Sequence, residues 1–96
     1  MPDTRANNVL SNQILRSATS VGANYRAART ARSEKEFAAK LQIALEEADE
    51  TQYWAELLIE VNLNRADELS VVLQEARELT AILVSALKTA RGKMRQ

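Results

Sequence analysis

Apolar and small side chains recur along most of the chain at intervals of three and four residues, a spacing that lines one face of an α-helix. The pattern falls into three stretches and predicts three long helices, over residues 4–31, 34–62 and 65–91. The apolar positions are Leu10, Ile14, Ala18, Val21, Tyr25 and Ala28, then Phe37, Leu41, Ala44, Ala48, Thr51, Ala55, Leu58 and Val61, and finally Leu69, Val72, Leu73, Ala76, Leu79, Ile82, Leu83, Ala86, Leu87 and Ala90.

Polar residues mark the expected helix ends. The expected N-cap residues are Asp3 or Thr4, then Ser33, and then Asn64. Ser33 with Glu36 forms the pattern of a capping box, in which the Glu36 carboxylate reaches back to the Ser33 amide. Gly92 is expected to end the last helix as its C′ residue. The short connections predict that consecutive helices run antiparallel.

These features predict an all-α fold, an antiparallel up-and-down helical bundle that forms a single domain over residues 1–96. The second and third helices carry apolar residues on more than one stripe, with Leu45, Leu57 and Ile59 beside the main stripe of the second. A lone helical hairpin buries only one stripe per helix. The extra apolar faces therefore predict a homo-oligomer.

The composition excludes several classes of protein function. Among the 96 residues there is no cysteine and no histidine, and there are only one proline and two glycines. The missing side chains remove thiol nucleophiles, thiolate zinc sites and the commonest proton shuttle at neutral pH. We therefore expect no enzymatic activity, no cofactor and no metal.

Charge is segregated along the chain although the formal net charge is +0. Residues 1–40 carry seven basic and three acidic side chains, residues 41–78 two and ten, and residues 79–96 four and none. Antiparallel packing within one chain, or side-to-side packing of copies, would match these opposite charges. No stretch resembles a signal peptide or a membrane span, so a cytoplasmic protein without membrane contact is expected.

Two groups of polar residues are candidate sites. Glu47 and Glu50 lie on one helix face and could bind a hard cation, but repulsion within the carboxylate cluster favours a solvated or arginine-paired interpretation. Arg16, Ser20 and Asn24 form a ribbon along the first helix. The ribbon is either a contact surface or, as we favour, a bridge from Arg16 to Glu47 or Glu50 with the other two satisfying buried polar groups.

Basic and aromatic residues form the other candidates. Arg26, Arg29 and Arg32 could contact phosphates, although a solvated helix end that offsets the acidic middle helix is the simpler interpretation. Tyr53 and Trp54 could stack on a base, but their charged neighbours are acidic and would repel phosphates. We therefore interpret Tyr53 and Trp54 as anchors of an interface.

Three segments resemble one known family. They read QILRSATSVGANY over residues 13–25, SEKEF over 33–37 and EEADETQYWAELL over 46–58. Together they are similar to the four helix bundle protein family, also called the 23S rRNA intervening sequence protein or S23 ribosomal protein family. The similarity covers residues 8–60 by motif, including Arg16, Ser20, Asn24, Glu47 and Glu50, and the remainder by helical pattern.

The resemblance implies a four-helix subunit that assembles into a ring-like homopentamer. It also implies a relationship to the accessory factor of diversity-generating retroelements, a basic pentamer that binds nucleic acid. Two features depart from the family pattern. Ala27 stands where members usually carry Glu, and the segment over 4–31 corresponds to the family's second helix, so we expect that this chain lacks the first.

The sequence thus predicts a non-enzymatic, self-assembling helical-bundle protein with a scaffold or adaptor role. The alternative is an accessory protein that binds rRNA or other nucleic acid. Self-association and salt-dependent binding of nucleic acid are the properties that separate the two.

Overall fold

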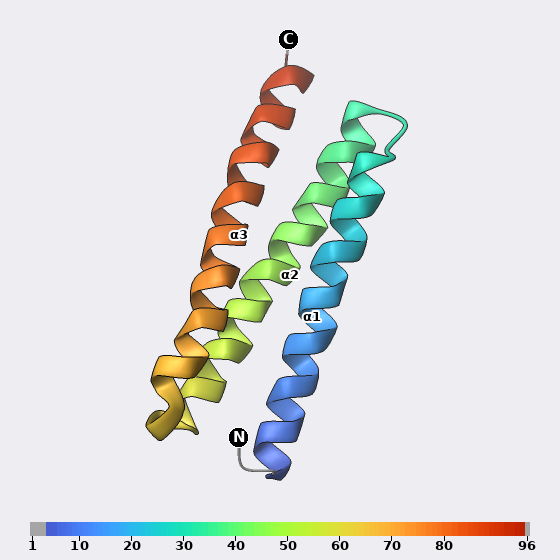
Figure 1. The fold of residues 1–96 in the computed structure, drawn as a ribbon. Coiled ribbons are helices and arrows are strands. Elements are labelled where there is room, and N and C mark those ends of the chain that lie inside the picture. The colour runs from blue at the N-terminus through green and yellow to red at the C-terminus, as the bar shows by residue number, and fades with distance from the viewer. Residues whose placement is uncertain (1–3, 96) are drawn as a thin grey trace.

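A computed structural model describes residues 4–95 and contains three long helices with a short turn of 3-10 helix. The helices are α1 (Arg5–Arg29), α2 (Glu34–Glu60) and α3 (Ala66–Met94), and the 3-10 turn η1 (Leu63–Arg65) connects α2 with α3. Successive helices run in opposite directions, so the α1–α2 connection and the C-terminus lie at one end of the molecule (Figure 1). The all-helical prediction is confirmed, and the predicted bounds differ from the observed ones by at most three residues.

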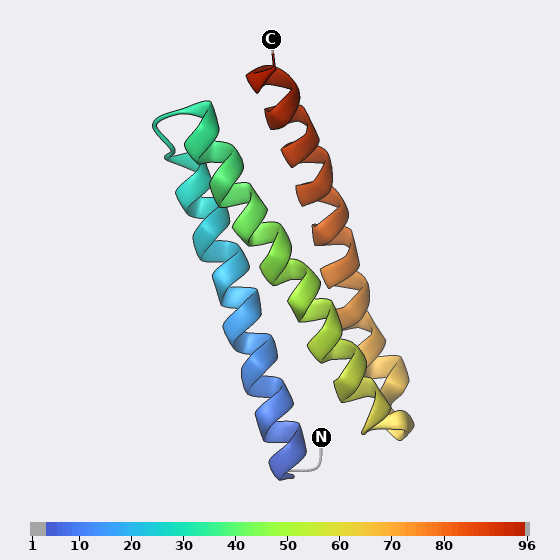
Figure 2. The same ribbon diagram turned by 180° about the vertical axis from the view of Figure 1, so that it is seen from behind.

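Helix α2 lies between the other two helices. Both α1 and α3 pack along α2, whereas within these described helices no Cα atom of α1 lies within 8 Å of a Cα atom of α3. The view from behind shows the same separation between α1 and α3 (Figure 2). The molecule is elongated, with extents of 51 × 19 × 13 Å. The surface between α1 and α3 is hollowed into a groove, and residues of α2 line it together with residues of the other two helices.

The core follows α2, because this helix alone has neighbours on two sides. Leu41 of α2 and Leu83 of α3 are the largest apolar side chains that are fully buried, at 0% and 1% exposure. Alanines fill seven of the twelve other buried apolar positions and let the helices approach closely. The buried apolar residues are Leu10, Val21, Ala28, Ala38, Leu41, Ala44, Ala48, Ala55, Leu58, Leu73, Ala76, Leu83, Leu87 and Ala90.

The first two helices have the predicted N-cap residues, Thr4 and Ser33. The Asn7 amide donates to Thr4 Oγ1 at 3.1 Å, and the Glu36 amide donates to Ser33 Oγ at 3.0 Å. The Glu36 carboxylate accepts from the Arg32 amide at 3.1 Å, one residue earlier than a capping box requires. The bonds to Thr4 and Ser33 each satisfy an amide of the first helical turn that helix geometry leaves without an intrahelical partner. Asp3, the other expected cap, lies outside the described residues.

Two predicted helix ends are wrong. Asn64 does not cap α3, because it lies inside the 3-10 turn, which the Arg65 amide closes by donating to the Asn62 carbonyl at 2.8 Å. Gly92 is not a C′ residue, because α3 continues through it to Met94 and no described glycine has a positive φ. A glycine inside a helix costs only about 1 kcal/mol relative to alanine. The helix-forming residues on either side of Gly92 therefore allow α3 to continue through it.

Candidate functional site

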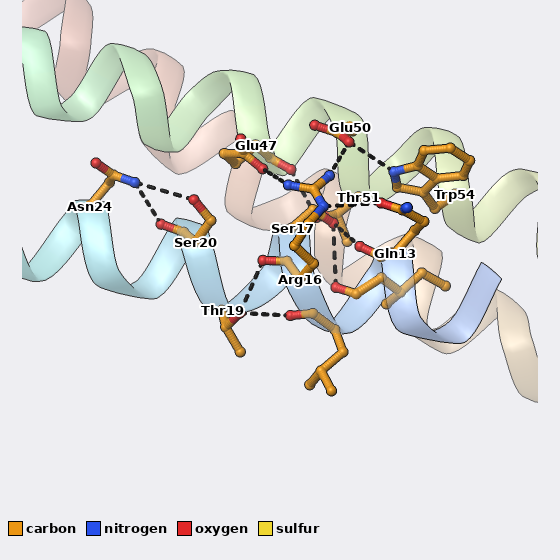
Figure 3. A network of polar contacts seen from close by, with 12 residues as sticks. Gln13, Arg16, Ser17, Thr19, Ser20, Asn24, Glu47, Glu50, Thr51 and Trp54 are labelled. Atoms are coloured by element: carbon orange, nitrogen blue, oxygen red, sulfur yellow. Dashed lines mark hydrogen bonds and ion pairs between the residues drawn. The ribbon is translucent and has the colours of Figure 1, made fainter. Parts of the chain in front are cut away.

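A polar network joins the outer surfaces of α1 and α2 (Figure 3). Arg16 Nη1 lies 3.2 Å from Glu47 Oε2, and its Nη2 pairs with Glu50 Oε1. Arg16 Nε donates to Gln13 Oε1 at 3.0 Å, and Trp54 Nε1 donates to Glu50 Oε1 at 3.0 Å. The guanidinium thus bridges two carboxylates one helical turn apart, as the bridging interpretation expects.

Solvent limits what this network contributes. The side chains of Arg16, Glu47 and Glu50 are 48%, 21% and 36% exposed. Ion pairs at such exposure contribute about 0–1 kcal/mol, because water screens the attraction and ordering long side chains costs entropy. Arg16 occupies both carboxylates from one side, which favours an interhelical brace over a cation or catalytic site.

Ser20 and Asn24 do not take part in that bridge. Asn24 Nδ2 donates to the Ser20 carbonyl at 2.9 Å and to Ser20 Oγ at 3.3 Å, so both bonds lie within α1. Both side chains are half-buried. The expectation that these residues satisfy buried polar groups of another helix is therefore not met by any bond that the structure shows.

The polar crossing between α1 and α2 is made instead by Ser17 and Thr51, beneath Arg16 (Figure 3). The Thr51 hydroxyl donates to Ser17 Oγ at 2.7 Å, and Ser17 Oγ donates to the Gln13 carbonyl at 2.9 Å. Ser17 is 0% exposed and Thr51 is 7% exposed. The sequence signal was present, since Thr51 interrupts the apolar stripe of α2, but its partner could not be chosen from spacing alone.

A second buried polar pair joins the end where α1 begins to the end of α2. Asn62 Nδ2 donates to Asn7 Oδ1 at 2.7 Å, and Asn7 Nδ2 donates to Asn62 Oδ1 at 3.2 Å. Asn62 also donates to the Leu58 carbonyl at 2.9 Å. The sequence alone does not reveal this pair, because both residues stand near helix termini, where asparagine is common for local reasons.

Tyr53 and Trp54 lie on the outer side of α2. Their rings meet edge to face with centroids 4.9 Å apart. Tyr53 is 54% exposed, and Trp54 is half-buried with its indole nitrogen committed to Glu50. This exposed aromatic pair remains a candidate interface anchor.

Basic residues gather at one end of the molecule, where α1 ends, α2 begins and α3 ends (Figure 1). Residues 26–40 and 88–95 carry nine basic side chains against two acidic ones. An open depression of 570 Å³ there is lined by Arg29, Arg32 and Lys93 together with Glu34. Arg26 shares a neighbouring depression with Arg29 beside Tyr25. The charges that are segregated along the chain are therefore also segregated along the long axis of the molecule. Basic residues concentrate at this end, and acidic residues lie toward the opposite end.

The groove between α1 and α3 is lined mainly by apolar residues. Its central part has a volume of 180 Å³ and is lined by Ile14, Ala18 and Val21 of α1, by Ala48 and Thr51 of α2, and by Val72, Glu75, Ala76 and Leu79 of α3. Leu79 and Ile82, which the helical pattern places on the apolar face of this helix, are 38% and 62% exposed. They are exposed because no element of residues 4–95 covers the outward side of α3.

Two further findings concern the described residues only. Within residues 4–95, no three carboxylates come together in an arrangement that could hold a metal ion. No helix in the same range combines the length and the apolar character needed to cross a bilayer.

The fold and these features define a small all-helical protein with a braced α1–α2 pair and an open apolar groove. Residues 1–85 match the family model of the 23S rRNA-intervening sequence protein, so the chain belongs to this family. A solved structure from the S23 ribosomal protein family of Bacteroides thetaiotaomicron, a protein of unknown function, is 45% identical. The similarity covers 83% of this chain and 74% of that one, with a TM-score of 0.78. None of the curated proteins matches the chain.

Proposed function

We propose that the protein is a non-enzymatic scaffold that acts through self-assembly. The observation that carries this proposal is the open groove between α1 and α3, whose apolar rim includes Leu79 and Ile82. Exposed apolar surface of this kind is normally covered by another protein surface. The family resemblance favours a ring of five copies.

The polar network supports the same proposal in a second way. The brace from Arg16 to Glu47 and Glu50 and the Ser17–Thr51 bond hold α1 and α2 as one unit. A rigid pair of helices presents the exposed Tyr53 ring and the groove in fixed positions. Pre-ordered surfaces lose little entropy on association, which favours assembly.

Thermal unfolding at several concentrations tests the proposal. If subunits associate in the native state only, the midpoint temperature rises with concentration, because mass action stabilises the assembled form. Circular dichroism at 222 nm from about 1 to about 100 µM protein covers the relevant range of dissociation constants. A midpoint that stays constant over this range would contradict self-assembly.

A second candidate function is the binding of nucleic acid, and the cluster of nine basic residues at one end favours it. Arg29, Arg32 and Lys93 line one depression there and could contact neighbouring phosphates. Binding through phosphates would weaken steeply with salt, since counterions are released from the nucleic acid.

Binding of a labelled rRNA fragment and of a duplex across a salt series tests this second function. The variant R29Q/R32Q/K93Q removes three positive charges from the basic end, and R5Q/R65Q/R77Q removes three elsewhere. The second function predicts a large loss of affinity for the first variant only. Equal losses in the two variants, or no binding by the native chain at low salt, would exclude a dedicated surface at this end.

A further inference from the structure

We infer that the depression at the basic end of the molecule binds a terminal phosphate, the phosphomonoester at the end of a nucleic acid strand, in preference to the phosphodiesters within the strand. The inference rests on the second candidate function, the binding of nucleic acid, and names the chemical group that this end selects. It is carried by the lining of the depression, by its cations and by the acidic residues beyond it.

The depression combines an apolar surface with positive charge. Its volume is 570 Å³, and its apolar lining consists of Ala28, Ala31, Phe37, Ala86 and Ala90. Phe37 is partly buried and packs against the hydrophobic core. An aromatic ring beside positive charges is a surface on which a terminal base can stack while the phosphate of the same nucleotide meets the cations.

Positive charge reaches the depression from two sides. Arg29 and Arg32 come from the end of α1 and the loop after it, and Lys93 comes from the end of α3. Within residues 4–95, neither Arg29 nor Lys93 has a carboxylate within ion-pair distance. Arg32 lies 3.8 Å from Glu36, but its side chain is 92% exposed and is free to turn toward a ligand. All three cations can therefore donate to one phosphate group.

A terminal phosphate suits this site better than an internal one. A phosphomonoester carries a charge of about −1.5 to −2 at pH 7, whereas each phosphodiester carries a single negative charge. Three cations around one depression attract a single doubly charged group more strongly than a singly charged one.

The groove that leads away from the depression is unfavourable for a polyanion. Ala28 and Ala86 of the depression lie seven residues from Val21 and Leu79 of the central groove, so both hollows follow the same helix faces. Glu75 lines the central part, and residues 41–78 carry ten acidic side chains against two basic ones. A strand that continued along the groove would be repelled. A strand whose end lies in the depression avoids this repulsion.

One acidic residue also borders the depression. Glu34, in the first turn of α2, lies among the lining residues and opposes an anion there. Removal of this carboxylate should therefore strengthen the binding of a phosphate in the depression, whereas removal of a distant carboxylate should not.

Binding of short single strands, measured by the fluorescence anisotropy of an internal label, tests the inference. One strand carries a phosphate at its 5′ end, a second carries it at its 3′ end, and a third is two nucleotides longer with hydroxyl ends, so that its full charge is the same. We expect at least one phosphorylated strand to bind about tenfold more tightly than the third, the effect of one further hydrogen bond to a charged group.

Two pairs of variants locate the site. E34Q should tighten the binding of the preferred strand about threefold, and E60Q, the same charge change at the far end of α2, should alter it less. A31L fills the depression without changing its charge and should abolish the preference for a terminal phosphate, whereas A39L, at an exposed position of α2 outside the depression, should keep it. Circular dichroism verifies that each variant is folded.

The outcomes separate this inference from the function on which it rests. Equal binding of all three strands, an unchanged preference in A31L, or equal effects of E34Q and E60Q would overturn the terminal-phosphate site and leave nucleic-acid binding intact. No binding of any strand at low salt would overturn both.

Discussion

Asn7 and Asn62 form a reciprocal amide pair that locks the start of α1 to the end of α2. Their side chains donate to one another at 3.2 and 2.7 Å, and each residue is only 4% exposed. A one-residue slide of α1 along α2 would break both bonds and leave buried polar atoms without these partners. The pair therefore fixes the axial register of the two helices.

We predict that N62A lowers the free energy of unfolding by about 1–3 kcal/mol, because it removes both interhelical bonds from a buried site. Urea denaturation at fixed protein concentration measures the change. The matched control is N64A, since Asn64 is exposed in the neighbouring turn. A loss in N62A no greater than that in N64A would show that the pair does not stabilise the fold.

A double-mutant cycle measures the coupling between the Ser17 and Thr51 hydroxyls. We expect S17A and T51V each to destabilise the protein by about 1 kcal/mol, because each removes the bond between the helices, whereas the remaining hydroxyl still has a carbonyl of its own helix as a partner. The double variant S17A/T51V should lose clearly less than the two single losses together, since it removes both hydroxyls at once. Strictly additive losses would mean that the two hydroxyls are not coupled.

The surface brace should matter little for stability. We predict that R16Q lowers the free energy of unfolding by no more than about 1 kcal/mol, because all three partners are solvent-accessible. The loss should shrink in about 1 M salt, where screening acts over about 3 Å. R26Q, an exposed charge change on the same helix, is the control. A loss of several kcal/mol that persists in salt would contradict this account.

Glu68 gives a prediction that depends on pH. The hydrogen bond from Arg65, followed by the attraction of its charge, lowers the pKa of Glu68 below the ordinary value of 4.5. Because the folded-state pKa is the lower one, the stabilisation is present above 4.5 and is lost as the pH falls through the folded-state pKa. Carboxyl chemical shifts measured by NMR should show the Glu68 pKa rising in R65Q and unchanged in R77Q. An unchanged Glu68 pKa in R65Q would exclude Arg65 as the cause.

The helices could be predicted from sequence because their apolar positions repeat over many turns. Thr4 and Ser33 were identifiable as caps, since their side chains act on amides only three residues away. Asn64 and Gly92 were misinterpreted by the same local rules. Asn64 lies inside a 3-10 turn and Gly92 inside α3, so the elements around these residues override their local preference for a helix end.

One part of the candidate site, the contact of Arg16 with acidic residues of α2, could also be predicted from the sequence. Charge and helix periodicity together restrict Arg16 to partners such as Glu47 and Glu50. Spacing alone does not identify which buried hydroxyl or amide lies opposite Thr51 or Asn62, because that depends on the axial shift between helices. The exposed stripe of α3 was visible as excess apolar surface, but the absence of α1–α3 contact emerges only from the fold.

Sedimentation equilibrium of the native chain at tens of micromolar tests the central claim most directly. Self-assembly through the groove face predicts a mass of two or more times 10.7 kDa at these concentrations. The expected helical content should be measured on the same sample, so that an unfolded chain is recognised. A well-folded species of 10.7 kDa at every concentration would contradict the account.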